Sequence, residues 1–300
     1  MKEERQRYLS HSSRIIMHRE MPLRGGHSSQ SPQCNGVVLA LIQDGAQRNR
    51  ILMALRGRHE IQFVEDVNDL VAITRAATYP VDGIIVAMRD RSGRSTCGMV
   101  RALAATEGSA AIVAYCRAGA EHSADIRAIV LAGAHELVFE GIDDSGVALR
   151  AALGAAQQAQ LGLRAAAQIM PLVDERLWPF VRHVTAYPTT QRVAAVADAL
   201  GYNRKTLVNH CMQAKVPPPQ QLLAWCRLCV VAELLSTTSR TIEAIAFQLD
   251  YSSDTALRNM IKRYTRLRAS DVRARGGVAC VISALRQAIA AHRSGQEAVG

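Results

Sequence analysis

The stretch VAAVADALGYNRKTL, from Val193 to Leu207, returns in altered form as IEAIAFQLDYSSDTAL, from Ile242 to Leu257. Both copies open with a β-branched residue and an alanine two positions on, pass through Leu-x-Tyr, and reach a leucine after a polar run. A repeat this short cannot be a solenoid, which needs several units stacked on one another. The two copies of one small structural module therefore predict that the same function is performed twice, once by each copy.

The first copy predicts two short helices joined by a tight turn. Thr189 or Thr190 is the expected cap of the first helix, and Gly201 ends it, because glycine tolerates the left-handed conformation of such a turn. Asn203 is the expected cap of the second helix, RKTLVNHCMQ. The inward face comprises Val196, Leu200, Leu207 and Cys211. This is a helix-turn-helix, whose second helix enters the major groove of DNA.

The second copy follows the same logic. Thr241 caps its supporting helix, residues 250–252 make the turn, and Ser253 caps the second helix, DTALRNMIKRY. Leu257, Ile261 and Tyr264 face inward. Between the copies, apolar residues cover most of the predicted helix from Gln220 to Leu235, and a helix of that kind is buried between other elements. It would hold the two modules at a fixed distance, so that they read successive major-groove faces about 34 Å apart.

This layout resembles the DNA-binding domain of the AraC/XylS family of transcription regulators. The resemblance covers about 100 residues and includes both modules, the linking helix and the preceding RLWPFVRHVTAYPTT. The sequence departs from the family's usual residues at a few positions: Asp250 for Gly, Ala269 for Pro, Cys211 and Ile261 for Phe, Asn209 for Arg, and Met212 for Lys.

Helix geometry and the family resemblance agree on the residues that would contact DNA. Base readout is expected from the following side chains: Lys205, Val208 and Asn209 in the first module, and Asp254, Thr255, Arg258 and Asn259 in the second. Arg204 and Lys262 are expected to contact phosphate. Asparagine suits a bidentate contact to adenine, and arginine suits guanine.

The distribution of charge indicates that only one segment of the chain binds a polyanionic partner. The net charge of the chain is +10, and residues 186–275 carry 13 basic and 6 acidic side chains. Residues 36–160 carry 12 basic and 14 acidic side chains. A basic segment beside a nearly neutral one indicates that the segment holding the repeat binds nucleic acid.

Residues 36–160 alternate between apolar runs and helical patterns. The runs GVVLALIQ, EIQFVED, VDGIIVAM, SAAIVAYC and HELVFE read as five buried strands, each followed by a helix. Short right-handed crossovers keep such strands parallel. We therefore expect the α/β part of the fold to be a five-stranded doubly wound, flavodoxin-like sheet, followed by an all-helical domain.

The order and spacing resemble the receiver domain of response regulators, which carries a phosphoryl group on an aspartate. That resemblance places Ala87 at the phospho-acceptor position, Gln43 and Asp44 at the acidic pair that holds Mg²⁺, and Glu140 at the position of a lysine. Alanine has no oxygen to phosphorylate, and glutamate repels a phosphate. We predict a receiver-like scaffold without the phosphorylation chemistry. Asp90, three residues past Ala87, is the alternative acceptor.

These patterns divide the chain into five parts. We expect a disordered tail over residues 1–35, the receiver-like domain over 36–160, a linker helix over 161–171, the AraC-type domain over 172–275, and a C-terminal helix or tail over 276–300. Control is expected through a homodimer formed by the receiver-like domain or linker, or through a small-molecule or protein effector. An effector would bind at the carboxyl edge of the sheet, where the following residues gather: Asp44, Arg89, Asp90, Tyr115 and Arg117.

Other features argue against catalysis, metal binding and membrane insertion. The sequence has no apolar run of about 18 residues and no signal peptide, and seven cysteines without a regular framework suit a reducing cytoplasm. The lone CxxC of Cys226 and Cys229 lies in a predicted buried helix, so we interpret it as core, with a redox site as the alternative. No cofactor is expected.

Three hypotheses for the function of the chain are compatible with these patterns. The main hypothesis is a sequence-specific DNA-binding transcription regulator. The alternative is a signalling adaptor whose receiver-like domain binds a partner protein and whose helical half binds DNA without sequence preference. An enzyme using the crevice of the sheet is disfavoured, because IQDGAQRN carries one glycine and not a glycine-rich phosphate loop.

Overall fold

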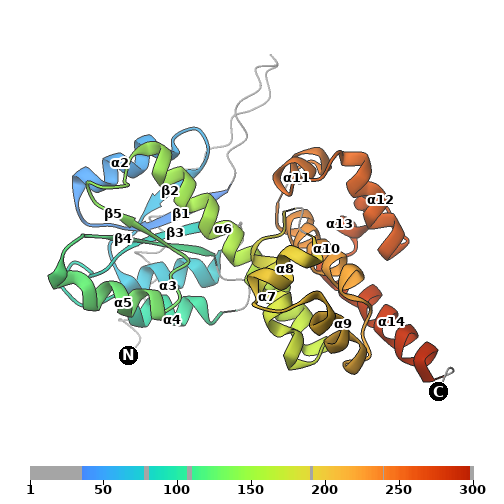
Figure 1. Ribbon diagram of the computed structural model, residues 1–300. Coiled ribbons are helices and arrows are strands. Elements are labelled where there is room, and N and C mark those ends of the chain that lie inside the picture. The colour runs from blue at the N-terminus through green and yellow to red at the C-terminus, as the bar shows by residue number, and fades with distance from the viewer. Residues whose placement is uncertain (1–35, 78–80, 107–109, 190–191, 239, 298–300) are drawn as a thin grey trace, which may run out of the picture. The chain divides into compact units, whose positions relative to one another are not determined.

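The computed structural model describes residues 36–77, 81–106, 110–189, 192–238 and 240–297 (Figure 1). The predicted tail over residues 1–35 lies outside this part of the chain. No helix in the described ranges is long and apolar enough to cross a bilayer.

The N-terminal half is built on a parallel sheet with the strand order β2-β1-β3-β4-β5. Its strands are β1 Val37–Leu41, β2 Glu60–Phe63, β3 Val81–Ala87, β4 Ala111–Cys116 and β5 Glu136–Phe139. Every pair is parallel, with Ile85 of β3 opposite Ala40 of β1 and Val113 of β4. This is the flavodoxin-like order, in which the chain reverses its direction of growth between β1 and β3. The doubly wound sheet expected from the sequence is confirmed.

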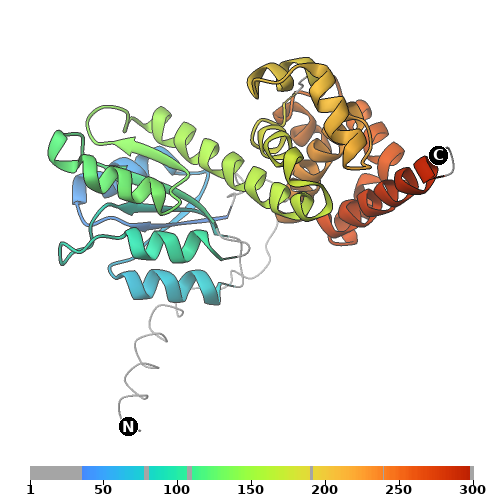
Figure 2. The same cartoon turned by 60° about the horizontal axis from the view of Figure 1, so that its bottom comes forward.

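Helices cover both faces of the sheet. They are α2 Gly45–Leu55, α3 Val67–Ala76, α4 Cys97–Ala104, α5 Ser123–Leu131 and α6 Gly146–Ile169, with a 3₁₀ turn at Ala120–His122. Ile51 of α2 and Leu149 of α6 pack on one face, whereas Leu70 of α3, Val100 of α4 and Ile129 of α5 pack on the other. Figure 2 shows α6 above the sheet and α3 and α4 below it.

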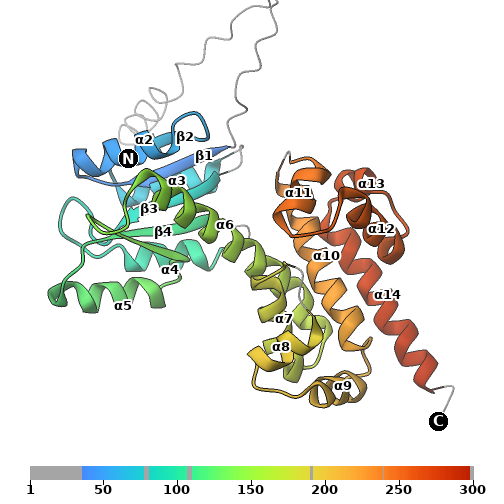
Figure 3. The ribbon, with the colours of Figure 1, turned by 45° about the horizontal axis from the view of Figure 1, so that its top comes forward.

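The C-terminal half is entirely helical (Figure 3). Its α-helices are α7 Trp178–Ala186, α8 Val193–Ala199, α9 Arg204–Gln213, α10 Pro219–Thr237, α11 Ile242–Gln248, α12 Asp254–Thr265, α13 Ala269–Ala274 and α14 Val278–Glu297. Short 3₁₀ turns at Met170–Leu172 and Glu175–Leu177 precede them. α14 lies alongside α10 and buries Val281 and Leu285 in the same core, so it docks onto its own domain.

The boundary expected at residue 160 falls inside one continuous helix. The sequence predicts a receiver-like domain ending at residue 160 and a linker helix over 161–171, whereas α6 runs unbroken from Gly146 to Ile169. Leu153 belongs to the core of the sheet, and Ile169 belongs to the helical core. Gly162 allows α6 to approach α7 closely, because a Cβ at this position would lie 2.6 Å from the carbonyl oxygen of Thr185.

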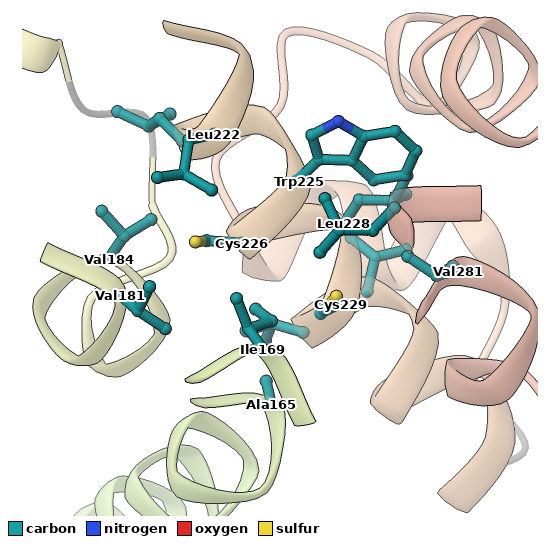
Figure 4. Packing of buried hydrophobic residues seen from close by; sticks show 14 of the residues in the cluster. Ala165, Ile169, Val181, Val184, Leu222, Trp225, Cys226, Leu228, Cys229 and Val281 are labelled. Carbon is teal, nitrogen blue, oxygen red and sulfur yellow. The ribbon is translucent and has the colours of Figure 1, made fainter. Parts of the chain in front are cut away.

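α10 is buried on nearly every side. Leu222, Trp225 and Leu228 are at most 3% exposed, and Cys226 and Cys229 are fully buried among them (Figure 4). The interpretation of the CxxC as core is consistent with this placement. Two charged side chains are buried on the same helix, which the apolar pattern of the sequence did not predict. Arg227 and Glu233 are 9% and 8% exposed.

The left-handed turn at Gly201 can be tested by comparing the substitution of this glycine with that of a glycine inside a helix. Gly201 has φ +68°, and nothing lies within 4 Å of an added Cβ. Gly201→Ala should therefore lower the free energy of unfolding by about 1 kcal/mol through backbone strain alone. Gly154 lies inside α6 with equally open space, so Gly154→Ala should raise the free energy of unfolding by about 0.5–1 kcal/mol. Urea denaturation measures both, and equal signs would contradict the assigned turn.

The cysteines offer a second check on the cores. Burial raises the pKa of Cys116 to about 11 and of Cys211 to about 12, and it raises the pKa of Cys226 and Cys229 further. Brief treatment with iodoacetamide at pH 8, followed by peptide mass spectrometry, should label the half-buried Cys97 and Cys280. The four buried thiols should react about 100-fold more slowly until urea is added. Rapid labelling of Cys226 or Cys229 in the folded protein would favour the redox alternative.

Candidate nucleic-acid interface

The two copies of the repeat fold into the same turn. In the first, the amide of Tyr202 donates to the carbonyl of Ala197 at 2.8 Å, and in the second the amide of Tyr251 donates to Ala246 at 2.9 Å. Gly201 and Asp250 occupy the same place in the two turns, with φ +68° and +56°. Aspartate is among the few residues that visit this left-handed region. The replacement of glycine by Asp250 therefore leaves the turn intact.

The predicted caps explain where most of these helices begin. Asn203 accepts from the amide of Thr206 at 2.8 Å, Ser253 accepts from Ala256 at 3.0 Å, and Thr241 accepts from Ala244 at 3.2 Å. The expectation for α8 is wrong. Its cap position is Arg192, which makes no side-chain capping bond, and the helix begins at Val193. Thr189 is too far upstream, and Thr190 lies outside the described residues.

In each module, the second helix buries the residues that the sequence predicts to face inward. Leu207 and Cys211 of α9 are 1% and 2% exposed, and Leu257 and Ile261 of α12 are fully buried. Tyr264 packs edge-on against Trp225 of α10, with ring centroids 4.9 Å apart. Both modules thus rest on α10 by their inner faces, and α9 and α12 lie toward its opposite ends (Figures 1 and 3).

The predicted DNA contacts occupy the remaining faces of α9 and α12. Arg204 and Lys205 are exposed, whereas Val208 and Asn209 are half-buried. In the second module the exposed side chains are Thr255, Arg258, Asn259 and Lys262, and Asp254 is half-buried. Because Asn203 and Ser253 are equivalent caps, Asn209 and Asn259 stand at the same position of their helices. Their contacts with DNA remain predictions.

The two faces differ in charge at equivalent positions. Asp254 and Arg258 of α12 form an ion pair one turn apart, with Nη2 and Oδ2 3.1 Å from each other. The hydrogen bond from Arg258 lowers the pKa of Asp254, so the carboxylate is charged at neutral pH. The first module has Arg204 and Val208 at these positions. The two helices therefore present different patterns of donors and acceptors.

Arg227 is a functional candidate that the sequence analysis missed. Its Nε donates to the carbonyl of Pro188 at 2.9 Å, and its Nη2 donates to the carbonyl of Leu249 at 3.2 Å. Its guanidinium lies 4.2 Å from the ring centre of Tyr251. One signal in the sequence was available, namely a single arginine inside an otherwise apolar stretch of helix.

The structure gives the surroundings of Gln43, Asp44 and Ala87, three of the residues predicted at receiver positions. Asp44 caps α2, accepting from the amides of Ala46 and Gln47 at 2.9 and 3.0 Å, and these bonds lower its pKa. Gln43 donates to the carbonyl of Glu65 at 3.3 Å. Ala87 ends β3 and is half-buried. Neither Gln43 nor Ala87 carries a carboxylate, and Asp44 is held in a helix cap.

An ion-pair network stands beside the position where a receiver would have its lysine. Glu140 pairs with Arg117 at 3.0 Å and with Arg50 at 3.7 Å. Arg50 also pairs with Asp144 at 2.8 Å, and the hydroxyl of Tyr115 donates to Asp144 at 2.5 Å. Burial and this hydrogen bond raise the pKa of Tyr115 to about 12, so the phenol keeps its proton.

The five residues expected at the carboxyl edge fall into two groups. Asp44 and Tyr115 are linked to the network through Arg50 and Arg117. Arg89 and Asp90 instead organise the loop after β3. Arg89 pairs with Asp125 at 2.7 Å, and Asp90 accepts from Ser92 and Arg94 of its own loop. The described residues contain no group of three histidine, cysteine or acidic side chains placed to hold a metal ion.

Comparisons with known proteins cover both halves of the chain. Residues 196–275 match the family model of a helix-turn-helix domain. Solved structures similar to the chain include the chemotaxis response regulator CheY4 of Vibrio cholerae, with 16% identity over 40% of this chain and 98% of that one and a TM-score of 0.33. The signal receiver domain of an HD domain-containing protein from Pseudomonas fluorescens Pf-5 shares 16% identity over 47% of this chain and 98% of its own, with a TM-score of 0.36. No curated protein matches.

The strand order, and not these distant likenesses, carries the assignment of the N-terminal fold. The matched domain model, together with two helix pairs that share the same turn hydrogen bond, supports the assignment of the C-terminal half. The chain carries a helix-turn-helix domain of the kind found in DNA-binding transcription regulators, and this domain follows a doubly wound, flavodoxin-like α/β domain.

Proposed function

We propose that the protein binds specific DNA sequences with both helix-turn-helix modules, which enter successive major-groove faces. The observation that carries this proposal is the equivalence of the two modules. They share a turn hydrogen bond, a cap position and a buried leucine four residues after that cap, and both pack on the single helix α10. Two modules fixed to one helix suit two half-sites about one helical turn apart.

Each recognition helix has a distinct role in this proposal. In α9, Lys205, Val208 and Asn209 read bases, and Arg204 contacts phosphate. In α12, Asp254, Thr255, Arg258 and Asn259 read bases, and Lys262 contacts phosphate. Asp254 orients the guanidinium of Arg258, which presents its paired donors to a guanine, while Asn209 and Asn259 suit adenine. This function requires no cofactor and no catalytic step.

Selection of bound sequences from a random DNA pool tests the proposal. A motif with two half-sites about one helical turn apart supports it. Binding that is salt-sensitive but indifferent to sequence would favour the adaptor function, because contacts to phosphate alone carry no sequence information.

Control of this activity is proposed to pass through binding to the receiver-like domain and not through phosphorylation. The supporting observation is the network of Arg50, Arg117, Glu140, Asp144 and Tyr115, in which arginines already neutralise the carboxylates. A dimer partner, formed through this domain or α6, or a small-molecule or protein effector would supply the signal. Such a ligand regulates only by binding the active and inactive states with different affinity.

Arg258 and Lys262 give a matched pair of predictions on one helix. Arg258→Ala should cost about 1–3 kcal/mol at one base position and relax the preference there, since Arg258 contacts a base edge. Lys262→Ala should weaken binding to all sequences and reduce the slope of log affinity against log salt by about one. Fluorescence anisotropy over a salt series measures both. A uniform loss for Arg258→Ala would reassign that residue to phosphate.

The receiver-like domain should not accept a phosphoryl group. Ala87 has no acceptor oxygen, and Asp90 is engaged by Ser92 and Arg94 within its own loop. Incubation of the protein with acetyl phosphate and Mg²⁺, followed by intact mass spectrometry, should leave the mass unchanged. A stable gain of one phosphoryl group that Asp90→Ala abolishes would restore an ordinary phosphorelay.

A further inference from the structure

Arg227 connects three segments that lie far apart in the sequence. It projects from α10 and is 9% exposed. It holds the carbonyl of Pro188, in the segment that leads from α7 toward the first module, and the carbonyl of Leu249, in the turn of the second module. Tyr251, in the same turn, lies against its guanidinium. One side chain thus links the approach to the first module with the turn of the second.

These contacts differ in kind from the packing around them. The two modules rest on α10 through Leu207, Cys211, Leu257 and Ile261, and apolar packing of this sort is non-directional. Hydrogen bonds have preferred angles, and those made by a charged donor are about twice as strong as neutral ones. Guanidinium donors are also fixed in one plane and always charged. Arg227 can therefore fix an angle that the apolar contacts alone leave free.

The position of the Leu249 carbonyl also indicates that Arg227 fixes the orientation of the second module. Leu249 follows the last residue of α11, where helix carbonyls lack partners within the helix. Arg227 supplies a partner to that carbonyl from another helix and is stacked on the ring of the turn residue Tyr251. Rotation of the second module about its contacts with α10 would break the bond to Leu249 and separate the guanidinium from the ring.

We propose that Arg227 is a positioning residue that fixes the orientation of the second module relative to the first, and so makes DNA binding depend on the spacing of the half-sites. This inference rests on the proposed function, because it requires both modules to engage one DNA molecule. Two linked modules gain about 10²–10⁴-fold in affinity when geometry lets both bind, and they lose that gain when it does not. A rigid link confines the gain to one spacing.

The test uses the full chain and the DNA site obtained by selection, together with probes that carry one, two or five extra base pairs between the half-sites. The wild-type protein should lose at least about tenfold in affinity on insertion of two base pairs and about 100-fold on insertion of five. Arg227→Met removes both hydrogen bonds and keeps an aliphatic side chain. It should bind the native probe more weakly but lose less than about threefold on insertion of one or two base pairs.

Three further variants separate positioning from charge and stability. Arg286→Met removes one exposed positive charge from α14 and should keep the wild-type spacing profile. Arg227→Lys retains the charge without the planar fork, so its profile should resemble that of Arg227→Met. If Arg227→Met does not fold, as judged by circular dichroism, Arg227→Lys decides by the same criterion, because it lacks the planar fork that makes both hydrogen bonds. Tyr251→Leu removes only the ring beside the guanidinium and keeps both hydrogen bonds, so it should flatten the profile less than Arg227→Met.

The outcomes are distinct. A flattened spacing profile for Arg227→Met, or for Arg227→Lys where Arg227→Met does not fold, with isolated half-sites bound as by the wild type, supports the inference. A profile parallel to that of the wild type, with the same loss at every spacing, overturns it and leaves Arg227 as a stabilising residue only. Absence of any two-part motif for the wild-type protein would refute the proposed function itself, whereas a two-part motif bound equally well at every spacing would overturn the inference alone.

Discussion

The burial of α10 on nearly all sides is the constraint on which the C-terminal half depends. Each large apolar side chain taken from water contributes about 1.5–3 kcal/mol, and α10 buries Leu222, Trp225, Leu228 and others against the surrounding helices. Helices as short as α8 and α11, with seven residues each, would not be stable alone in water. They exist because α10 supplies the apolar surface for their inner faces. The same packing leaves their second helices, α9 and α12, free to present polar faces.

Burial of Arg227 and Glu233 on this helix comes at a cost that the neighbours must offset. Arg227 meets two carbonyls and an aromatic ring, so its charge is solvated by the protein itself. For Glu233, burial raises the pKa, while Arg164 of α6 acts in the opposite direction. A packed core tolerates charge only where partners are in place, and such partners make one arrangement of the helices preferable to others.

The parts of this structure that the sequence predicted are those determined locally. Asn203 and Ser253 cap α9 and α12 with their own neighbours' amides, and Gly201 takes its left-handed turn without distant contacts. The predicted start of α8 was wrong, because a Thr-Thr pair resembled a cap whereas the helix begins later, after Arg192. The close approach of α6 to α7 at Gly162 is a contact between two helices, which the local sequence pattern does not show. The partners of Arg227 lie 39 and 22 residues away, beyond the reach of any local pattern.

The fold of the N-terminal α/β domain does not depend on the residues that a receiver would use for phosphorylation. Its sheet needs apolar strands and helices on both faces, and neither depends on a phosphoryl group. A glutamate in the place of a lysine would leave a negative cluster at the carboxyl edge, but Arg50 and Arg117 contribute the compensating charge from α2 and the loop after β4. Asp44 has become a helix cap. Replacing Glu140 by lysine alone would break its ion pairs with Arg50 and Arg117 and place three positive charges together. The N-terminal fold is thus stabilised by contacts that need no phosphoryl group, and its function has to be argued from what binds there.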